Sequence, residues 1–215
     1  MTGVRFANVP AWRQATGIVV APDGVGRHGA AADRGGIAVE LAFGGAYYGI
    51  VDAAELGLRV HPGAAAELTR AGAAIAEVLR RDHVPSHPQD PDLGFVYGTI
   101  IVDHEPATAP DGRARDATLR NVTIFADAEV DRSPCGSGTS ALLAALHAAG
   151  RLPVGGSIVN AGITGEAFTG TVTGETTVGP WPAVRTTVAG RAFVTGRHVF
   201  TIDERDPLGA GFLLR

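Results

Sequence analysis

Hydrophobic and polar positions alternate in one part of the chain and change to a helical spacing in the next. Ile37, Val39, Leu41 and Phe43 alternate with smaller or polar residues, which is typical of a half-buried strand. Gly44-Gly45 follows as a two-residue hairpin signal, so residues 46–52 are predicted to return as a second strand. Between Pro62 and Arg81 the apolar residues share one helical stripe, namely Leu68, Ala71, Ile75, Val78 and Leu79. This segment is predicted to be an amphipathic helix that covers a sheet.

The remaining apolar runs predict further strands, and segments rich in glycine or proline predict the loops between them. Strands are expected at residues 3–10, 15–20, 96–102, 119–126, 157–160, 168–173, 184–188 and 192–202. Residues 22–36 and 103–118 are polar and lack periodicity, so they are expected to be loops. No internal repeat and no linker between two cores is visible. The pattern therefore indicates one α+β domain.

Residues 131–141 read Asp-Arg-Ser-Pro-Cys-Gly-Ser-Gly-Thr-Ser-Ala and hold the only cysteine of the chain, Cys135. Pro134 disfavours helical geometry just before the cysteine, and Gly136 and Gly138 allow a tight turn and close approach of a ligand. A run of alanine and leucine follows up to Gly150 and predicts a helix. The thiol would then lie at unpaired amides and the positive end of a helix dipole. We expect a lowered pKa for Cys135 and room for a carboxylate at these amides.

Other interpretations of this segment stay open. A lone cysteine is usually a small buried apolar residue, although the glycines and the proline beside Cys135 favour a functional role. Asp131 either accepts a hydrogen bond from a substrate ammonium or ring nitrogen, or simply forms a turn. A cysteine hydrolase would need a nearby histidine. His147 lies twelve residues along the same predicted helix, about 18 Å away by helical rise, which is too far to activate the thiol.

Composition and charge narrow the function classes. The net charge of −4 disfavours a general nucleic-acid binder, and no run of about 18 apolar residues predicts a membrane span. The first residues lack the apolar core of a secretory signal, so a cytoplasmic location is expected. All 18 basic residues are arginine, so no lysine is available for a pyridoxal phosphate Schiff base. His83 and His87 lie in a turn-rich segment without a helix, and we expect no metal site there.

The cysteine segment resembles the second-cysteine signature of the proline racemase family, which includes 4-hydroxyproline 2-epimerases and trans-3-hydroxyproline dehydratases. The resemblance extends along the chain through residues 5–10, 44–48, 50–53, 92–98, 121–127, 168–170 and 211–214. It implies one lobe of a diaminopimelate-epimerase-like fold, in which a curved, mostly antiparallel sheet wraps around a central helix. Residues 1–199 would form this carboxy-terminal lobe. Residues 200–215 would cross back to an amino-terminal lobe that the chain lacks.

The resemblance also implies a chemistry. It suggests cofactor-independent racemisation or epimerisation at the α-carbon of proline or hydroxyproline, with Cys135 as a catalytic residue. Asp131, Gly136 and Ser137 would bind the substrate. Racemases of the family use two cysteines, and the first lies in a Cys-Gly-His-Gly motif that is absent here. The expected partner is therefore a complementing amino-terminal half or a second copy in a homodimer.

Two alternatives accompany this interpretation. A trans-3-hydroxyproline dehydratase of the same family usually has threonine in place of the second cysteine, so Cys135 argues against it. Ala46 argues for it, because many racemases and epimerases have asparagine at that position. The other alternative is a catalytically inactive fragment or binding module.

Overall fold

The computed structural model describes residues 3–104 and 118–211, and a single ten-stranded sheet dominates it. The strands are β1 (Val4–Ala7), β2 (Trp12–Val20), β3 (Ile37–Phe43), β4 (Tyr47–Asp52), β5 (Val96–His104), β6 (Thr118–Phe125), β7 (Glu129–Val130), β8 (Ser157–Gly162), β9 (Ala167–Val178) and β10 (Trp181–Gly190). The helices are α1 (Ala30–Arg34), α2 (Ala65–Asp82) and α3 (Gly136–Ala148). Short 3₁₀ turns occupy Ala53–Leu56, Pro62–Ala64 and Pro91–Leu93.

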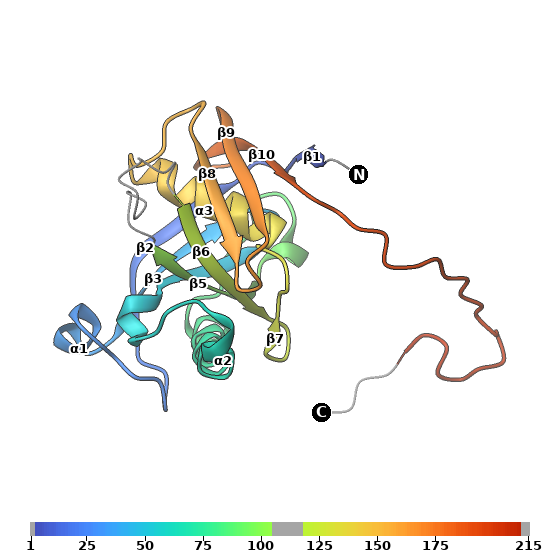
Figure 1. Ribbon diagram of the computed structural model, residues 1–215, viewed down its shortest axis with the longest axis horizontal. Helices are drawn as coiled ribbons and strands as arrows, with labels where there is room; N and C mark the ends of the chain where they lie inside the picture. The colour runs from blue at the N-terminus through green and yellow to red at the C-terminus, as the bar shows by residue number, and fades with distance from the viewer. Residues whose placement is uncertain (1–2, 105–117, 212–215) are drawn as a thin grey trace.

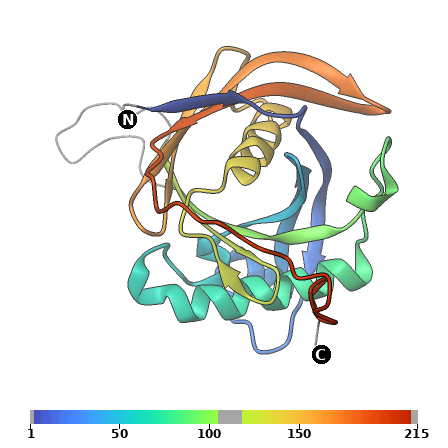
Figure 2. The ribbon, with the colours of Figure 1, turned by 90° about the vertical axis from the view of Figure 1, so that its right-hand side faces the viewer.

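The sheet curves until its two ends meet. Its order is β1-β10-β9-β8-β6-β5-β4-β3-β2, with β7 paired beside β6. The pairs β4–β5 and β6–β8 are parallel, and the others are antiparallel. Ala11, just before β2, forms an isolated bridge with Val184 of β10. The strands therefore surround α3 almost completely, as Figure 2 shows, while α2 lies outside them.

Strand alternation gives each face of the sheet its own core. On β4, Tyr47 and Val51 join the cluster on the α2 side, whereas Tyr48 belongs to the cluster on the α3 side. Helix α2 buries one stripe, which includes Leu68, Ile75 and Leu79. Residues Gly138–Ala145 of α3 are all buried, as expected for a helix that is apolar all round. Within the described part of the chain, no helix is both long and apolar enough to cross a membrane.

The expected fold class is confirmed: the chain is an α+β lobe with a curved sheet around a central helix. The predicted helix over 62–81 and the hairpin around Gly44-Gly45 are both present. Two smaller expectations need correction. The opening strand is confined to Val4–Ala7, and the predicted loop 22–36 contains the short helix α1. Most of the predicted loop 103–118 lies outside the described residues.

The terminal segment, residues 191–211, extends away from the body without forming a helix or strand, as Figure 1 shows. The strand predicted at 192–202 is therefore wrong. A strand forms when its amides and carbonyls pair with a neighbour, and no described strand pairs with this segment. Its large apolar side chains are exposed, namely Phe193, Val194, Val199, Phe200, Ile202 and Leu208.

Candidate active site

Cys135 occupies the N-cap of α3, so the thiol lies at the entrance of the central helix. Its sulfur accepts a hydrogen bond from the backbone N–H of Gly138, with an N–S distance of 3.3 Å. The backbone of Cys135 has φ 63° and ψ 112°, a region that residues other than glycine rarely adopt. Such a conformation costs about 1–3 kcal/mol and persists only where the surroundings enforce it.

A buried amide network enforces this conformation. Asn121 of β6 and Asn160 of β8 both donate to the carbonyl oxygen of Pro134, at 3.2 and 3.3 Å. The two amides also bond each other at 2.7 Å, and Asn160 donates to the hydroxyl of Thr139. Thr139 in turn donates to the carbonyl of Cys135 at 2.7 Å. All three side chains are fully buried, so the network ties the cysteine loop rigidly to two strands and to α3.

Two hydroxyl groups adjoin the sulfur of Cys135. The hydroxyl of Tyr48 lies 3.6 Å from the sulfur, and that of Ser137 lies 3.8 Å from it. The two hydroxyls bond each other at 2.7 Å. Because one proton occupies the bond between them, the other hydroxyl proton stays available to the sulfur, whichever oxygen is the donor. The site therefore offers a thiolate two hydrogen bonds, one from the Gly138 amide and one from this hydroxyl pair.

The expected lowering of the Cys135 pKa is wrong for this chain. The side chain is only 6% exposed, and burial raises its pKa because the thiolate loses its hydration. Hydrogen bonds from Tyr48, Gly138 and Ser137 act in the opposite direction without reversing the shift. Burial also raises the pKa of Tyr48, which keeps its hydroxyl protonated as a donor. Burial therefore favours the neutral thiol over the thiolate.

Asp131 lies in the same loop but is engaged with the backbone. Its carboxylate Oδ1 accepts from both the amide and the hydroxyl of Ser133, each at 2.8 Å. The Ser133 hydroxyl then accepts from the amide of Cys135 at 3.1 Å. Asp131 thus supports the turn before the thiol, one of the two roles expected for it. Its predicted contact with substrate stays a prediction.

The predicted anion cradle at Gly136 and Ser137 has open amides. Neither backbone N–H finds an acceptor among the described residues, and both residues are partly exposed. The hairpin glycines press closely on this turn. A Cβ at Gly44 would collide with the Ser137 carbonyl oxygen and the Ala141 amide, so only glycine fits there. The β3–β4 hairpin is therefore what positions the start of α3.

The rim of the site is apolar. Phe6 and Val9 are 45% and 49% exposed. An added Cβ at Gly136 would touch the ring of Phe6, and one at Gly45 would touch Val9, so both side chains lie beside the turn. Asn8 holds this entry segment in place by donating to the Gly44 carbonyl and the Ser140 hydroxyl, both at 2.8 Å.

Several residues of the site were not predicted from the sequence. Tyr47 and Tyr48 lie on the predicted strand 46–52, and both are buried core residues; the ring of Tyr47 packs on Trp12. Tyr48 also reaches the thiol. Because neighbouring residues on a strand face opposite sides of the sheet, alternation could have indicated that only one of these two tyrosines faces the helix that carries the thiol. Asn121 and Asn160 lie within the predicted strands 119–126 and 157–160. An amide side chain within each apolar strand was the sequence signal that could have marked them as site residues.

The histidines lie elsewhere. His147 is at the far end of α3, where Nδ1 is 2.8 Å from the Leu152 carbonyl and Nε2 is 3.2 Å from a Glu175 carboxylate oxygen. His87 packs against the rings of Trp12 and Phe43. Residues 3–104 and 118–211 contain no group of three or more histidine, cysteine, aspartate or glutamate side chains arranged to hold a metal ion.

Known proteins resemble this chain along nearly its whole length. The family described as proline racemase matches residues 1–213. A trans-3-hydroxy-L-proline dehydratase of Burkholderia cenocepacia is 40% identical over 214 residues, which are 99% of this chain and 58% of that protein. A proline racemase of Clostridioides difficile is 37% identical over 213 residues, with the same two coverages. The crystal structure of a hydroxyproline epimerase from Agrobacterium vitis, with bound trans-4-OH-L-proline, has a TM-score of 0.81 and 35% identity. It covers 99% of this chain and 56% of that one.

The chain spans less than two thirds of the length of these relatives. Within that span, the match includes the cysteine loop, the hairpin that supports it and the strands that carry the amide network. The chain belongs to the proline racemase family.

Proposed function

We propose that this chain takes part in cofactor-independent racemisation or 2-epimerisation of proline or hydroxyproline and supplies one of two acid–base groups. The observation that carries the proposal is the surroundings of Cys135: an amide and a hydroxyl pair directed at its sulfur, next to the two open amides at the start of α3. The names of the relatives agree with this chemistry, since they include a proline racemase and a hydroxyproline epimerase.

The proposed reaction exchanges the α-proton of the substrate. A base on one face breaks the C–H bond, while an acid on the opposite face delivers a proton to the same carbon. Because burial favours the thiol form of Cys135, it would start as the acid, and its sulfur would become the thiolate that the Gly138 amide and the hydroxyl pair stabilise. The open amides of Gly136 and Ser137 would hold the substrate carboxylate and stabilise the charge that develops there. Asp131 would accept from the ring nitrogen through its free oxygen.

The second acid–base group is expected from residues outside this sequence. Cys135 is the only cysteine in the sequence, and inversion needs groups on both faces of the substrate. We propose a complementing amino-terminal half as the partner, with a second copy of this chain as the alternative. The exposed apolar side chains of residues 191–211 offer a surface for that partner, and residues 200–215 would cross to it. A free thiol persists best in a reducing compartment, so the cytoplasm is the proposed location.

Deuterium exchange tests the proposal. The chain alone, and the chain mixed with the amino-terminal part of the C. difficile proline racemase, are incubated with L-proline or trans-4-hydroxy-L-proline in deuterated water. We expect α-deuteration and inversion only in the mixture. Cys135→Ser should abolish both, whereas the exposed Ser157→Ala on β8 should leave them unchanged. Fast exchange by the isolated chain would contradict the half-site proposal. A mixture that forms a stable complex but does not depend on Cys135 would contradict the catalytic role of the thiol.

A dehydratase is the second candidate, because one of the relatives that are 40% identical is a trans-3-hydroxy-L-proline dehydratase, although another is a 3-hydroxyproline 2-epimerase. Ala46 fits this branch, and Cys135 in place of threonine does not. Formation of pyrroline-2-carboxylate from trans-3-hydroxy-L-proline by the same mixture would favour dehydration. Epimerisation of that substrate without loss of water would favour the first proposal.

A further inference from the structure

A second cavity opens at the other end of α3, well away from Cys135. Its volume is about 360 Å³, and Leu142, Ala145 and Leu146 of α3 form part of its wall. Leu142 and Leu146 are seven and eleven residues from Cys135, which places this wall of the cavity about 10–16 Å from the thiol along the helix axis. None of the residues around the thiol lines this cavity. It is therefore a separate site within the same lobe.

The register of the sheet brings charged side chains to this end of its inner face. Tyr48, Ile50 and Asp52 alternate along β4 toward the same face, so the strand runs from the thiol at one end to a carboxylate at the other. Glu40 pairs with Ile50 across β3 and β4, and His104 pairs with Leu119 across β5 and β6. Arg151 approaches from beyond the end of α3.

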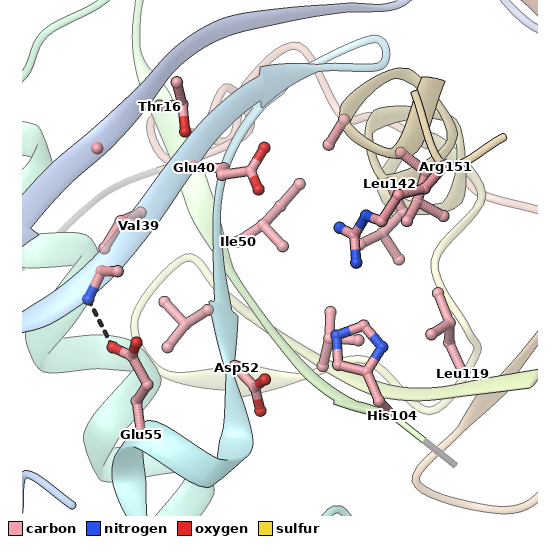
Figure 3. Close-up of a pocket in the computed structure, with 16 residues that line it drawn as sticks. Thr16, Val39, Glu40, Ile50, Asp52, Glu55, His104, Leu119, Leu142 and Arg151 are labelled. Atoms are coloured by element: carbon pink, nitrogen blue, oxygen red, sulfur yellow. Dashed lines mark hydrogen bonds between the residues drawn. The ribbon is translucent and has the colours of Figure 1, made fainter. Parts of the chain in front are cut away.

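Figure 3 shows these charges on two sides of an apolar centre. The carboxylates of Glu40 and Asp52 lie on the β3–β4 side, while the guanidinium of Arg151 lies on the opposite side, above the ring of His104. Ile50 lies near the two carboxylates, Leu142 lies near Arg151, and Leu119 lies near His104. The cavity thus has an acidic wall and a basic wall, and each wall also carries apolar side chains.

The charged groups around this cavity differ in how well they are paired. Oε2 of Glu40 is shielded from solvent yet accepts no hydrogen bond, and its nearest ion-pair atom, Arg13 Nη1, stays 3.5 Å away. No described residue forms an ion pair or side-chain hydrogen bond with Arg151 or His104. Glu55 provides the contrast, because it is saturated by Arg34 and by the amide of Ala38. Glu40 thus keeps one carboxylate oxygen without a hydrogen bond, Asp52 is occupied only by the Ala54 amide, and the exposed Arg151 and His104 have no ion-pair partner among the described residues.

We propose that this cavity binds a zwitterionic amino acid with a large apolar side chain. The ammonium would lie between Glu40 and Asp52, the carboxylate would bond Arg151 and His104, and the side chain would cover Leu142. A purely cationic ligand would make no bond to Arg151 or His104, and an anionic one would leave Oε2 of Glu40 without a hydrogen bond. The volume falls at the lower end of the range for small-molecule sites, which suits such a ligand. This inference is independent of the function proposed for Cys135.

Calorimetric titration of the full chain with L-phenylalanine tests the proposal. We expect saturable binding with one site per chain. Two analogues separate the contributions of the walls: 3-phenylpropionate lacks the ammonium, and 2-phenylethylamine lacks the carboxylate. Each should bind about tenfold more weakly or worse, since each loses charge-assisted hydrogen bonds. Equal binding of all three compounds would overturn the proposal, and so would the absence of L-phenylalanine binding.

Variants locate the binding. Glu40→Gln and Arg151→Gln should each weaken L-phenylalanine about tenfold or more. The matched controls Glu204→Gln and Arg197→Gln make the same charge changes in the exposed terminal segment and should leave affinity unchanged. Urea unfolding confirms that each variant is folded before titration. Affinity that is unaffected in the cavity variants but lost in Tyr48→Phe would place the ligand at the thiol and refute the second site.

Discussion

The sharpest test of the thiol environment is removal of the Tyr48 hydroxyl. In Tyr48→Phe the aromatic ring stays in the core, where it meets Tyr97 edge-on with centroids 5.7 Å apart. The sulfur loses the hydroxyl at 3.6 Å and keeps the amide of Gly138 at 3.3 Å. Ser137 then has a free proton, but at 3.8 Å from the sulfur it compensates only in part. The variant should therefore destabilise the thiolate while leaving the fold intact.

A hydrogen bond to a charged group contributes about 1.5–3 kcal/mol. The long oxygen–sulfur distance and the compensation by Ser137 favour the lower end, about 1.5 kcal/mol, which is roughly a tenfold decrease in thiolate at a fixed pH. Loss of this donor raises the pKa of Cys135 further above its ordinary range, because hydrogen bonds from Tyr48 and Ser137 lower it in the native chain. Tyr48→Phe combined with Ser137→Ala should lower the thiolate population more than either change alone.

The assay is the rate of alkylation by iodoacetamide as a function of pH. The chain has one cysteine, so the signal is unambiguous. The rate of Tyr48→Phe at about pH 8 should be roughly tenfold below that of the native chain, in line with the loss of one charge-assisted bond. Tyr97→Phe is the matched control, since it removes a neighbouring hydroxyl that makes no contact with the sulfur. Native rates in both Tyr48→Phe and the double variant would refute the hydroxyl-pair argument.

Three further predictions follow from the same framework around Cys135. Gly44→Ala should lower the free energy of unfolding by about 3 kcal/mol, because its Cβ meets backbone atoms of α3 that cannot move aside, while Gly174→Ala on β9 has space and should be tolerated in urea titrations. Asn160→Ala should cost about 1–3 kcal/mol in the same measurement, since it leaves buried partners unsatisfied, whereas the exposed Ser157→Ala should change stability by less than about 0.5 kcal/mol. The folded state raises the Cys135 pKa, so it favours the thiol; this contribution is complete below the unfolded pKa and is lost as pH rises through the folded value. Unfolding measured above about pH 8.5 should therefore show the native chain losing stability relative to Cys135→Ser, and parallel profiles for the two proteins would contradict the assigned burial effect.

Local pattern determined the elements of this protein. The alternation over residues 37–43 and the glycine pair after it specify a hairpin, and the stripe from Leu68 to Leu79 specifies a helix with one buried side. The run of alanine and leucine after Cys135 is apolar in every direction, which requires a helix surrounded by other elements. These elements depend on residues within about two turns of helix or a few strand positions of one another, so they can be predicted from the sequence alone.

Only the tertiary structure decided what surrounds the thiol. Tyr48 and Cys135 are 87 positions apart, and they meet because the sheet curves around α3 in one particular register. That curvature also buries the sulfur, which reverses the direction of the pKa shift expected from the helix N-terminus alone. Glu40 of β3 and Arg151, which follows α3, likewise meet only across the second cavity of the folded chain. Local periodicity says which side of a strand a residue faces, whereas the distant residue it meets depends on long-range pairing and closure of the sheet.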